Sequence, residues 1–152
     1  MIEGVKIKEL KVNRDERGRL YEILRMDEEF FQQFGQVYIT TVNPGYAKGW
    51  HYHKHQADNF TCVSGTLRIG LYDAREGSKT RGESQEVIIP SGQPVVVRIP
   101  EGIYHGFEAV GSSEAIVLNI PTRPYNPKEP DEFRLPFDCK DIPFKWHAKK
   151  GG

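Results

Sequence analysis

Apolar side chains recur at every second position through most of this chain, a pattern that predicts strands. Between residues 36 and 120, short runs of β-branched and aromatic residues are each bounded by glycine, proline or serine. Leu67, Ile69 and Leu71 share one face of such a run, and the residues between them share the other. Many short strands at this spacing, with little helix, are typical of a β-sandwich or barrel. The pattern therefore predicts an all-β fold.

The first 35 residues predict a hairpin followed by one short helix. Strand-like patterns on either side of the turn residues 15–18 indicate an N-terminal hairpin over about 4–25. Asp27 is suited to cap a helix over Glu28–Phe34, and Gly35 is suited to end it. We expect this helix to be the only one in the chain.

After residue 120 the chain becomes rich in proline, with six prolines between residues 121 and 143. Proline cannot donate a ladder hydrogen bond, so this stretch is not a central strand. Its aromatic side chains indicate a tail that packs over the barrel. We therefore expect a single domain over residues 1–152, with a hairpin at about 4–25, a barrel at about 36–120 and a packed tail at about 121–148.

Composition excludes several classes of partner. The 21 basic side chains balance the 21 acidic ones, which argues against broad electrostatic binding to nucleic acid. No apolar run is long enough to span a membrane, and the first ten residues lack the hydrophobic stretch of a signal peptide. Two cysteines make no disulfide framework in a chain of this length. We expect a cytoplasmic protein that binds neither nucleic acid nor membrane.

Four of the five histidines fall in two glycine-bounded segments. His51 and His53 project to the same face if they lie on one strand, Asp58 follows five residues later, and His105 lies near the start of a later strand. Three imidazoles and a carboxylate that converge inside a barrel form a ligand set for a divalent first-row metal. A metal site of His51, His53, Asp58 and His105 is therefore one hypothesis.

These two segments resemble the two signature motifs of the cupin superfamily of small jelly-roll barrels. The first motif has glycine, five residues, His-x-His, four residues, an acid, six residues and glycine, and it is met by Gly45, His51, His53, Asp58 and Gly65. The second motif is Pro-x-Gly-x-x-His, and it is met by Pro100, Gly102 and His105. The resemblance implies a double-stranded β-helix jelly roll.

A narrower resemblance covers most of the chain. The chain is similar to the dTDP-4-dehydrorhamnose 3,5-epimerase family, and it resembles the shorter, epimerase-like members of this family more closely. Five collinear motifs carry this resemblance: residues 15–22, 48–52, 73–82, 99–107, and 124–127 with the late Trp146. The resemblance implies an isomerase whose substrate is a nucleotide-linked 4-keto-6-deoxy sugar, and it implies no cofactor.

The resemblance also implies a mechanism. Epimerisation next to a keto group needs a base on one face of the sugar, an acid on the other, and stabilisation of the enolate oxygen. The family's base carries over to His51 and its acid to Tyr125. Substrate-binding roles carry over to Arg17, Glu22, Lys48 and His105.

Two positions depart from the family pattern. Lys48 stands where the family has a phosphate-binding arginine, and Asp58 stands where it has a lysine near the substrate oxygen. A carboxylate there would repel a developing enolate, whereas a divalent metal would supply the positive charge. His51 cannot be both a metal ligand and the base, so the metal-free and metal hypotheses compete for this residue.

We predict a homodimeric jelly roll, because the edge strands of such a barrel can be covered by pairing across a two-fold axis. The leading function is nucleotide-sugar epimerisation. The alternatives are a metal-dependent cupin isomerase or oxygenase with a small polar substrate, and a non-catalytic sugar-binding cupin.

Overall fold

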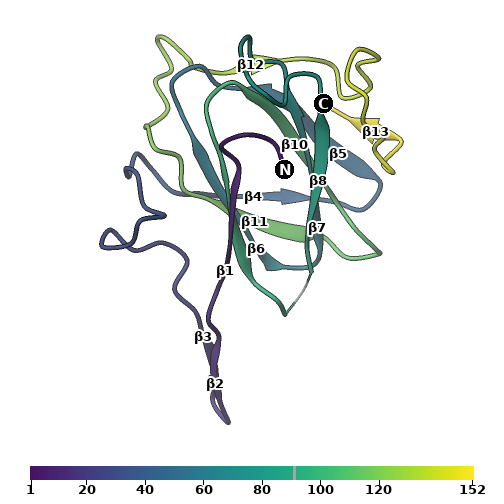
Figure 1. Cartoon of the computed structure of the whole chain (residues 1–152). Coiled ribbons are helices and arrows are strands. Elements are labelled where there is room, and N and C mark those ends of the chain that lie inside the picture. The colour runs from purple at the N-terminus through teal and green to yellow at the C-terminus, as the bar shows by residue number, and fades with distance from the viewer. Residues whose placement is uncertain (91) are drawn as a thin grey trace.

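Two β-sheets enclose the core in the computed structural model, which describes residues 1–90 and 92–152 (Figure 1). The five-stranded sheet has the order β1 (Lys6–Glu9), β9 (Val95–Ile99), β6 (Asp58–Ser64), β11 (Ala115–Asn119) and β4 (Tyr38–Val42). The six-stranded sheet contains, in order, β12 (Phe133–Arg134), β5 (Tyr46–Tyr52), β10 (Ile103–Ala109), β7 (Leu67–Asp73) and β8 (Ser84–Ile89), with β13 (Lys150–Gly151) parallel to β5. The prediction of an all-β jelly roll is confirmed.

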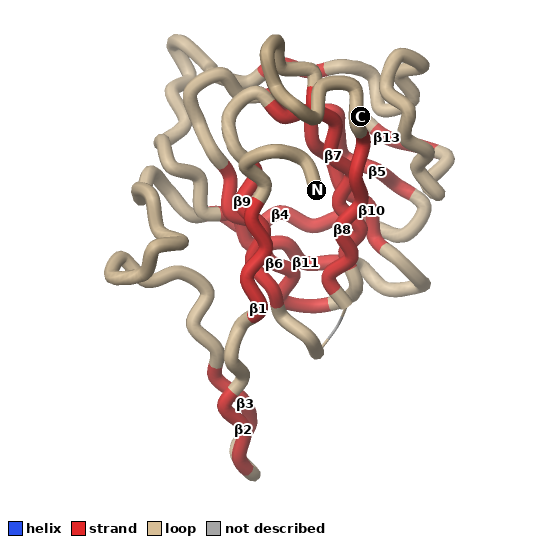
Figure 2. The backbone as a smooth tube through the Cα atoms, in the orientation of Figure 1, coloured by secondary structure: helices blue, strands red, loops and turns tan. Residues whose placement is uncertain are grey.

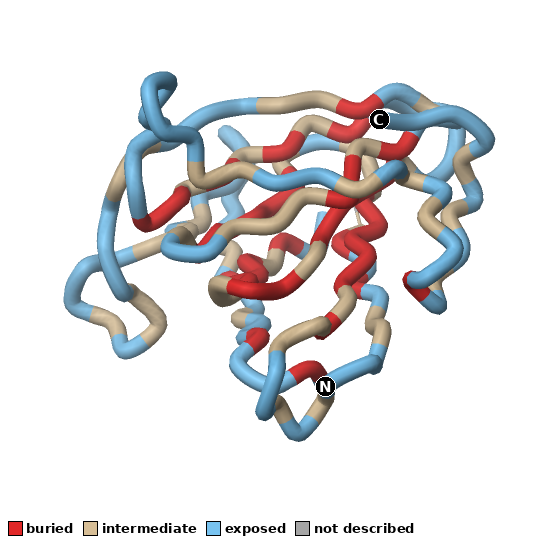
Figure 3. The backbone as a smooth tube through the Cα atoms, turned by 90° about the horizontal axis from the view of Figure 1, so that it is seen from above, coloured by how far each residue is buried: buried red, intermediate tan, exposed pale blue. Residues whose placement is uncertain are grey.

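The core lies between the two sheets, and exposed residues are concentrated in the surrounding loops (Figure 3). Leu67, Ile69 and Leu71 of β7 have at most 1% of their surface exposed, and they belong to one cluster with Val97 and Val117 of the opposite sheet. The period-two pattern thus correctly identified the face of β7 that points into the barrel.

The N-terminal hairpin is shorter than the sequence indicated. Its arms are β2 (Asn13–Asp15) and β3 (Gly18–Leu20), and it projects away from the barrel (Figure 1). Strand β1 does not pair with residues 20–24. It extends the five-stranded sheet instead, antiparallel to β9.

The predicted helix over Glu28–Phe34 is wrong. The described residues contain no helix (Figure 2). Among them there is accordingly no helix that could cross a membrane. The Asp27 carboxylate, expected to cap the helix, binds the Arg25 guanidinium at 2.7 and 2.9 Å. Phe30 packs beneath the Arg98 guanidinium, 4.6 Å from the ring centroid. A seven-residue helix is marginal by itself, and the local ion pair of Asp27 together with the tertiary contact of Phe30 outweighs its propensity.

A bulge in β5 determines which side chains face the barrel interior. His51 pairs with His105 of β10, but Lys48 pairs with Phe107, so three steps along β5 match two along β10. The extra residue reverses the alternation of side chains. Lys48 and His51 therefore line the same cavity, although residues three positions apart point to opposite faces of a regular strand.

The C-terminal tail lies over the outer face of the six-stranded sheet. Trp146 packs against Trp50 with ring centroids 4.8 Å apart, and a Cβ on Gly70 would lie 2.7 Å from the Trp146 ring. The buried Glu108 carboxylate accepts hydrogen bonds from the Arg68 guanidinium and from the backbone N–H groups of residues 147 and 148. This carboxylate thereby fastens the tail to the sheet.

Candidate active site

A cavity of about 320 Å³ opens between the sheets, and it contains most of the histidines singled out in the sequence. His51 and His105 enter it from paired positions of β5 and β10, with ring centroids 6.0 Å apart. His53 follows β5 directly, and Phe60 of the opposite sheet forms part of the wall. The jelly roll thus joins segments that lie more than 50 residues apart in the chain.

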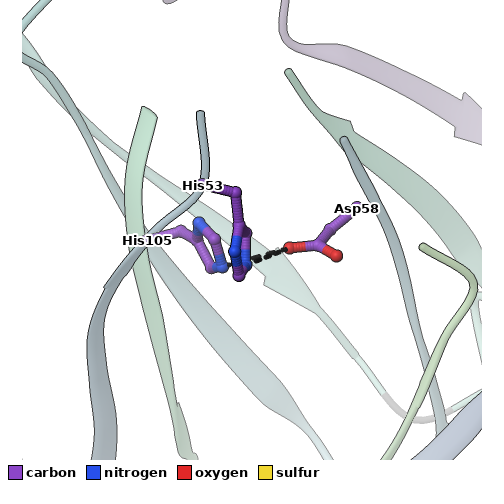
Figure 4. Close-up of side chains that lie close together, drawn as sticks. All are labelled: His53, Asp58 and His105. Atoms are coloured by element: carbon purple, nitrogen blue, oxygen red, sulfur yellow. Dashed lines mark ion pairs between the residues drawn. The ribbon is translucent and has the colours of Figure 1, made fainter. Parts of the chain in front are cut away.

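His53 and His105 form a cluster with the buried Asp58 (Figure 4). Asp58 is 1% exposed, and its Oδ2 lies 3.1 Å from Nε2 of His53 and 3.3 Å from Nε2 of His105. Its Oδ1 accepts hydrogen bonds from the side-chain amides of Gln56 and Asn119. Asp58 is therefore a fully coordinated internal carboxylate and does not face a substrate as an isolated charge.

The hydrogen-bond partners of the two imidazoles fix their orientation. Nδ1 of His53 contacts the backbone carbonyl of Asp131, and Nδ1 of His105 lies 3.1 Å from the carbonyl of Ile103. Because a carbonyl oxygen only accepts, each Nδ1 carries a proton, and each Nε2 points at Asp58. Either a proton or a metal ion can lie between Nε2 and the carboxylate. In metal sites, a backbone carbonyl that accepts a hydrogen bond from one ring nitrogen of a histidine orients the other nitrogen toward the metal in the same way.

Electrostatics favour a positive charge in this cluster. Burial would raise the pKa of Asp58, but hydrogen bonds from His105 and His53 hold it far below its ordinary value. Burial would likewise lower the pKa of His53, but its hydrogen bond to Asp58 raises it above the ordinary value. The His53 imidazolium and the Asp58 carboxylate therefore stabilise each other.

His51 lies in a different environment. The ligand atoms of His53, Asp58 and His105 lie within 4.8 Å of one another, and the ring nitrogens of His51 are not part of this group. Burial, together with the charges of His105 and Arg134, lowers the pKa of His51 to about 4. The imidazole is neutral near pH 7 and keeps a lone pair for a proton. The structure thus brings together three of the four predicted metal ligands and leaves His51 apart.

Tyr125 lines a second, larger cavity of about 1000 Å³. This cavity shares Tyr38, His53 and Glu132 with the smaller one, so the two adjoin. The Tyr125 side chain is accessible, because the residue is 56% exposed. A ligand that extends from one cavity into the other can therefore contact both His51 and Tyr125.

Of the predicted substrate-binding residues, Lys48 and His105 line the smaller cavity and the other two line neither. Lys48 donates a hydrogen bond to the Thr40 hydroxyl at 3.1 Å. Arg17 pairs with Asp15 on the projecting hairpin, and Glu22 pairs with Arg25. Within one chain, neither Arg17 nor Glu22 lines the cavity of His51.

The motif at residues 73–82 holds a loop together and does not line either cavity. Asp73 is fully buried and accepts hydrogen bonds from the side chains of Arg75, Ser78 and Thr80 at 2.6–2.9 Å. These residues fix the turn between β7 and β8.

Three ionisable residues that line the smaller cavity were not predicted from the sequence: Tyr38, Glu132 and Arg134. Asn119 donates to the Tyr38 hydroxyl at 2.9 Å, and burial, with the nearby charge of Asp58, raises the pKa of Tyr38 to about 12. Glu132 and Arg134 come from the part of the proline-rich tail that follows the motif at 124–127, where the sequence showed no signal beyond aromatic packing. Only the pairing of β12 with β5 brings them to His51.

Comparison with known proteins agrees with this geometry. The family model described as "Polysaccharide biosynthesis C-terminal domain" matches residues 13–133. The spore coat polysaccharide biosynthesis protein SpsL of Bacillus subtilis is 38% identical over 98% of this chain and 99% of its own length. The dTDP-4-dehydrorhamnose 3,5-epimerase of Methanothermobacter thermautotrophicus is 31% identical over 95% of this chain and 80% of its own length.

The crystal structure of a dTDP sugar isomerase from Desulfovibrio desulfuricans superposes with a TM-score of 0.89, at 33% identity. The match covers 95% of this chain and 92% of that one. This chain belongs to the dTDP-4-dehydrorhamnose 3,5-epimerase-like family. Membership confirms the resemblance found in the motifs.

Proposed function

We propose that this protein is an epimerase of a nucleotide-linked 4-keto-6-deoxy sugar. The observation that carries the proposal is a neutral His51 beside the positively charged groups of one cavity. Such a pairing provides a base together with stabilisation of the charge that proton removal creates. The names of relatives with dTDP-sugar activity support the substrate class.

The reaction begins when His51 removes the proton from a carbon next to the keto group. The C–H electron pair forms the enolate double bond, and the carbonyl electrons move onto oxygen. Tyr125 then delivers a proton to the opposite face of the same carbon, which inverts it. Lys48 holds the diphosphate, and the apolar wall formed by Phe60 and Phe107 limits the access of water to the reacting carbon.

Solvent exchange tests this proposal directly. Incubated in D₂O with dTDP-4-keto-6-deoxyglucose, the protein is expected to incorporate deuterium next to the keto group, as followed by NMR. Binding of the sugar without incorporation would instead favour the non-catalytic sugar-binding alternative.

We also propose a homodimer in which the hairpin of one chain reaches the cavity of the other. Leu20, Val37 and Ile39 are each more than half exposed, and the last of these lies on β4, an edge strand. The hairpin projects from its own barrel (Figure 1), and Arg17 at its tip is remote from its own His51 cavity. A two-fold arrangement buries the apolar residues and allows Arg17 to bind the substrate of the second subunit.

Mixing two inactive variants tests this arrangement. If Arg17 acts across the dimer, refolding His51→Asn together with Arg17→Ala restores activity, because each heterodimer then has one intact site. If Arg17 acts within its own chain, every site in the heterodimer carries one defect and activity stays low. Light scattering measures the mass of the same samples.

The cluster of His53, Asp58 and His105 supports a second candidate, a metal-dependent isomerase or oxygenase with a small polar substrate. These residues offer two imidazole nitrogens and one carboxylate oxygen, and a divalent ion bound there would act as a Lewis acid. Under the leading proposal, exchange is unchanged after treatment with a chelator. Loss of exchange, restored by added divalent metal, would overturn the metal-free mechanism and show that a metal takes part in the reaction.

We further propose that residues 1–152 act as one domain in the cytoplasm. The sheet contacts join segments from residue 6 to residue 151. Cys62 and Cys139 are free thiols, which suits a reducing compartment. Limited proteolysis and cell fractionation test the two statements.

A further inference from the structure

Removal of a proton next to a ketone creates an enolate oxygen, and the site must offer that oxygen a cationic or N–H donor group. Four positively charged or ionisable nitrogen side chains line the cavity of His51: Lys48, His53, His105 and Arg134. Their existing partners determine which of them can still donate to a substrate.

The two histidines have no free N–H groups. Both nitrogens of His53 face acceptors, the carbonyl of Asp131 and the carboxylate of Asp58. His105 is held in the same way by the carbonyl of Ile103 and by Asp58. Neither imidazole can donate a hydrogen bond to a substrate oxygen without breaking the buried cluster.

Arg134 is in a different position. It pairs directly with His51 across β12 and β5, whereas Lys48 lies opposite Phe107, beyond the bulge. Side chains of directly paired residues lie about 5 Å apart at Cβ. Only one amino group of Arg134, Nη2, has a partner among the described residues, Glu132 at 3.0 Å. Its side chain is 63% exposed, so its Nε and Nη1 hydrogens remain available to a ligand.

We propose that Arg134 is a catalytic residue that donates hydrogen bonds to the enolate oxygen formed when His51 removes the proton. This inference rests on the proposed epimerase function. Asp58 stands where the family has a lysine near the substrate oxygen, and Arg134 supplies the positive charge in its place. The ion pair with Glu132 fixes the direction of the Arg134 guanidinium. Lys48 is left to bind the diphosphate, farther along β5. No redox step is involved, since the enolate collapses to the ketone when a proton returns to carbon.

The test separates catalysis from binding. Arg134→Gln is expected to lower the rate constant for deuterium exchange at saturating substrate by about 10²–10³-fold, the usual effect of removing one such donor. The affinity for dTDP, measured by calorimetry, is expected to change less than about twofold. Arg134→Lys, which keeps the charge but loses the fork, is expected to recover part of the rate. Arg81→Gln, in an exposed turn, is the matched control and keeps full activity.

Each outcome decides a separate point. If the wild-type protein exchanges and Arg134→Gln keeps its rate constant, the inference fails while the epimerase proposal stands. If Arg134→Gln binds dTDP more than tenfold more weakly at an unchanged rate constant, Arg134 is a phosphate ligand and the inference is overturned. If the wild-type protein itself shows no exchange with 4-keto-6-deoxy sugars of several nucleotides, the proposed function fails and the inference fails with it.

Discussion

Nε2 of His53 lies 3.1 Å from Oδ2 of Asp58, at a position where the carboxylate is 1% exposed and the imidazole is largely enclosed. The other nitrogen of His53 is held by a backbone carbonyl. This pair connects the two sheets, because Asp58 begins β6 and His53 follows β5. It therefore bears on the stability of the barrel as well as on the charge in the cavity.

Asp58→Asn is expected to lower the free energy of unfolding by about 3–5 kcal/mol, because it leaves a buried imidazolium without its counter-charge. Urea denaturation monitored by tryptophan fluorescence measures this change. Asp138→Asn, at an exposed position, is the control and should change the free energy by less than about 0.5 kcal/mol. A loss below about 1 kcal/mol for Asp58→Asn would contradict the charged pair.

The contribution of this pair depends on pH in a defined way. The lowered pKa of Asp58 gives stability that is present above its ordinary value of 3.8 and is lost as the pH falls through the folded value. The raised pKa of His53 gives stability that is complete below its ordinary value of 6.5 and is lost as the pH rises through the folded value. The difference in unfolding free energy between wild type and Asp58→Asn is therefore expected to be larger at pH 5.5 than at pH 9.

His51→Asn is expected to reduce deuterium exchange by about 10²–10⁴-fold, the usual contribution of a general base. Its melting temperature should stay close to that of the wild type, because His51 lies outside the His53–Asp58–His105 cluster. Differential scanning calorimetry provides the comparison. A large fall in melting temperature would instead indicate that His51 belongs to a structural or metal-binding group.

The pH profile of kcat/KM reports the ionisation of His51 in the free enzyme. Since the pKa of His51 is lowered to about 4, the acid limb is expected near pH 4 and not near 6.5. Arg134→Gln removes one of the charges that lower this pKa, so its acid limb should move to higher pH. An acid limb near 6.5 in the wild type would mean that the imidazole is more solvated than the structure shows.

Tyr125→Phe separates the two halves of the reaction. The base is intact in this variant, so deuterium exchange at the carbon next to the ketone should continue. Inversion of that carbon needs a proton on the opposite face, and it is expected to fall by at least about 10²-fold. NMR of the sugar products distinguishes exchange with retention from exchange with inversion. Full inversion by Tyr125→Phe would remove this residue from the mechanism.

The sequence by itself determined the strands and the two histidine-bearing segments, because both depend on local pattern. Alternation in residues 67–71 predicts which side chains enter the core, and the spacing of His51, His53 and Asp58 follows from a short stretch of chain. The helix predicted over Glu28–Phe34 is absent because that prediction also rested on local pattern alone. Its local signal was real, but the contacts of Asp27 with Arg25 and of Phe30 with Arg98 outweigh it.

Only the tertiary structure decided the composition of the site. Whether Lys48 faces the cavity of His51 depends on the bulge in β5, and whether His51 joins the cluster of His53, Asp58 and His105 depends on the partners of the neighbouring imidazoles. Neither leaves a mark in the spacing of residues. Arg134 reaches His51 through a two-residue strand formed by a distant tail. Such pairings are set by long-range backbone hydrogen bonds and by packing across the barrel, which are properties of the folded chain as a whole.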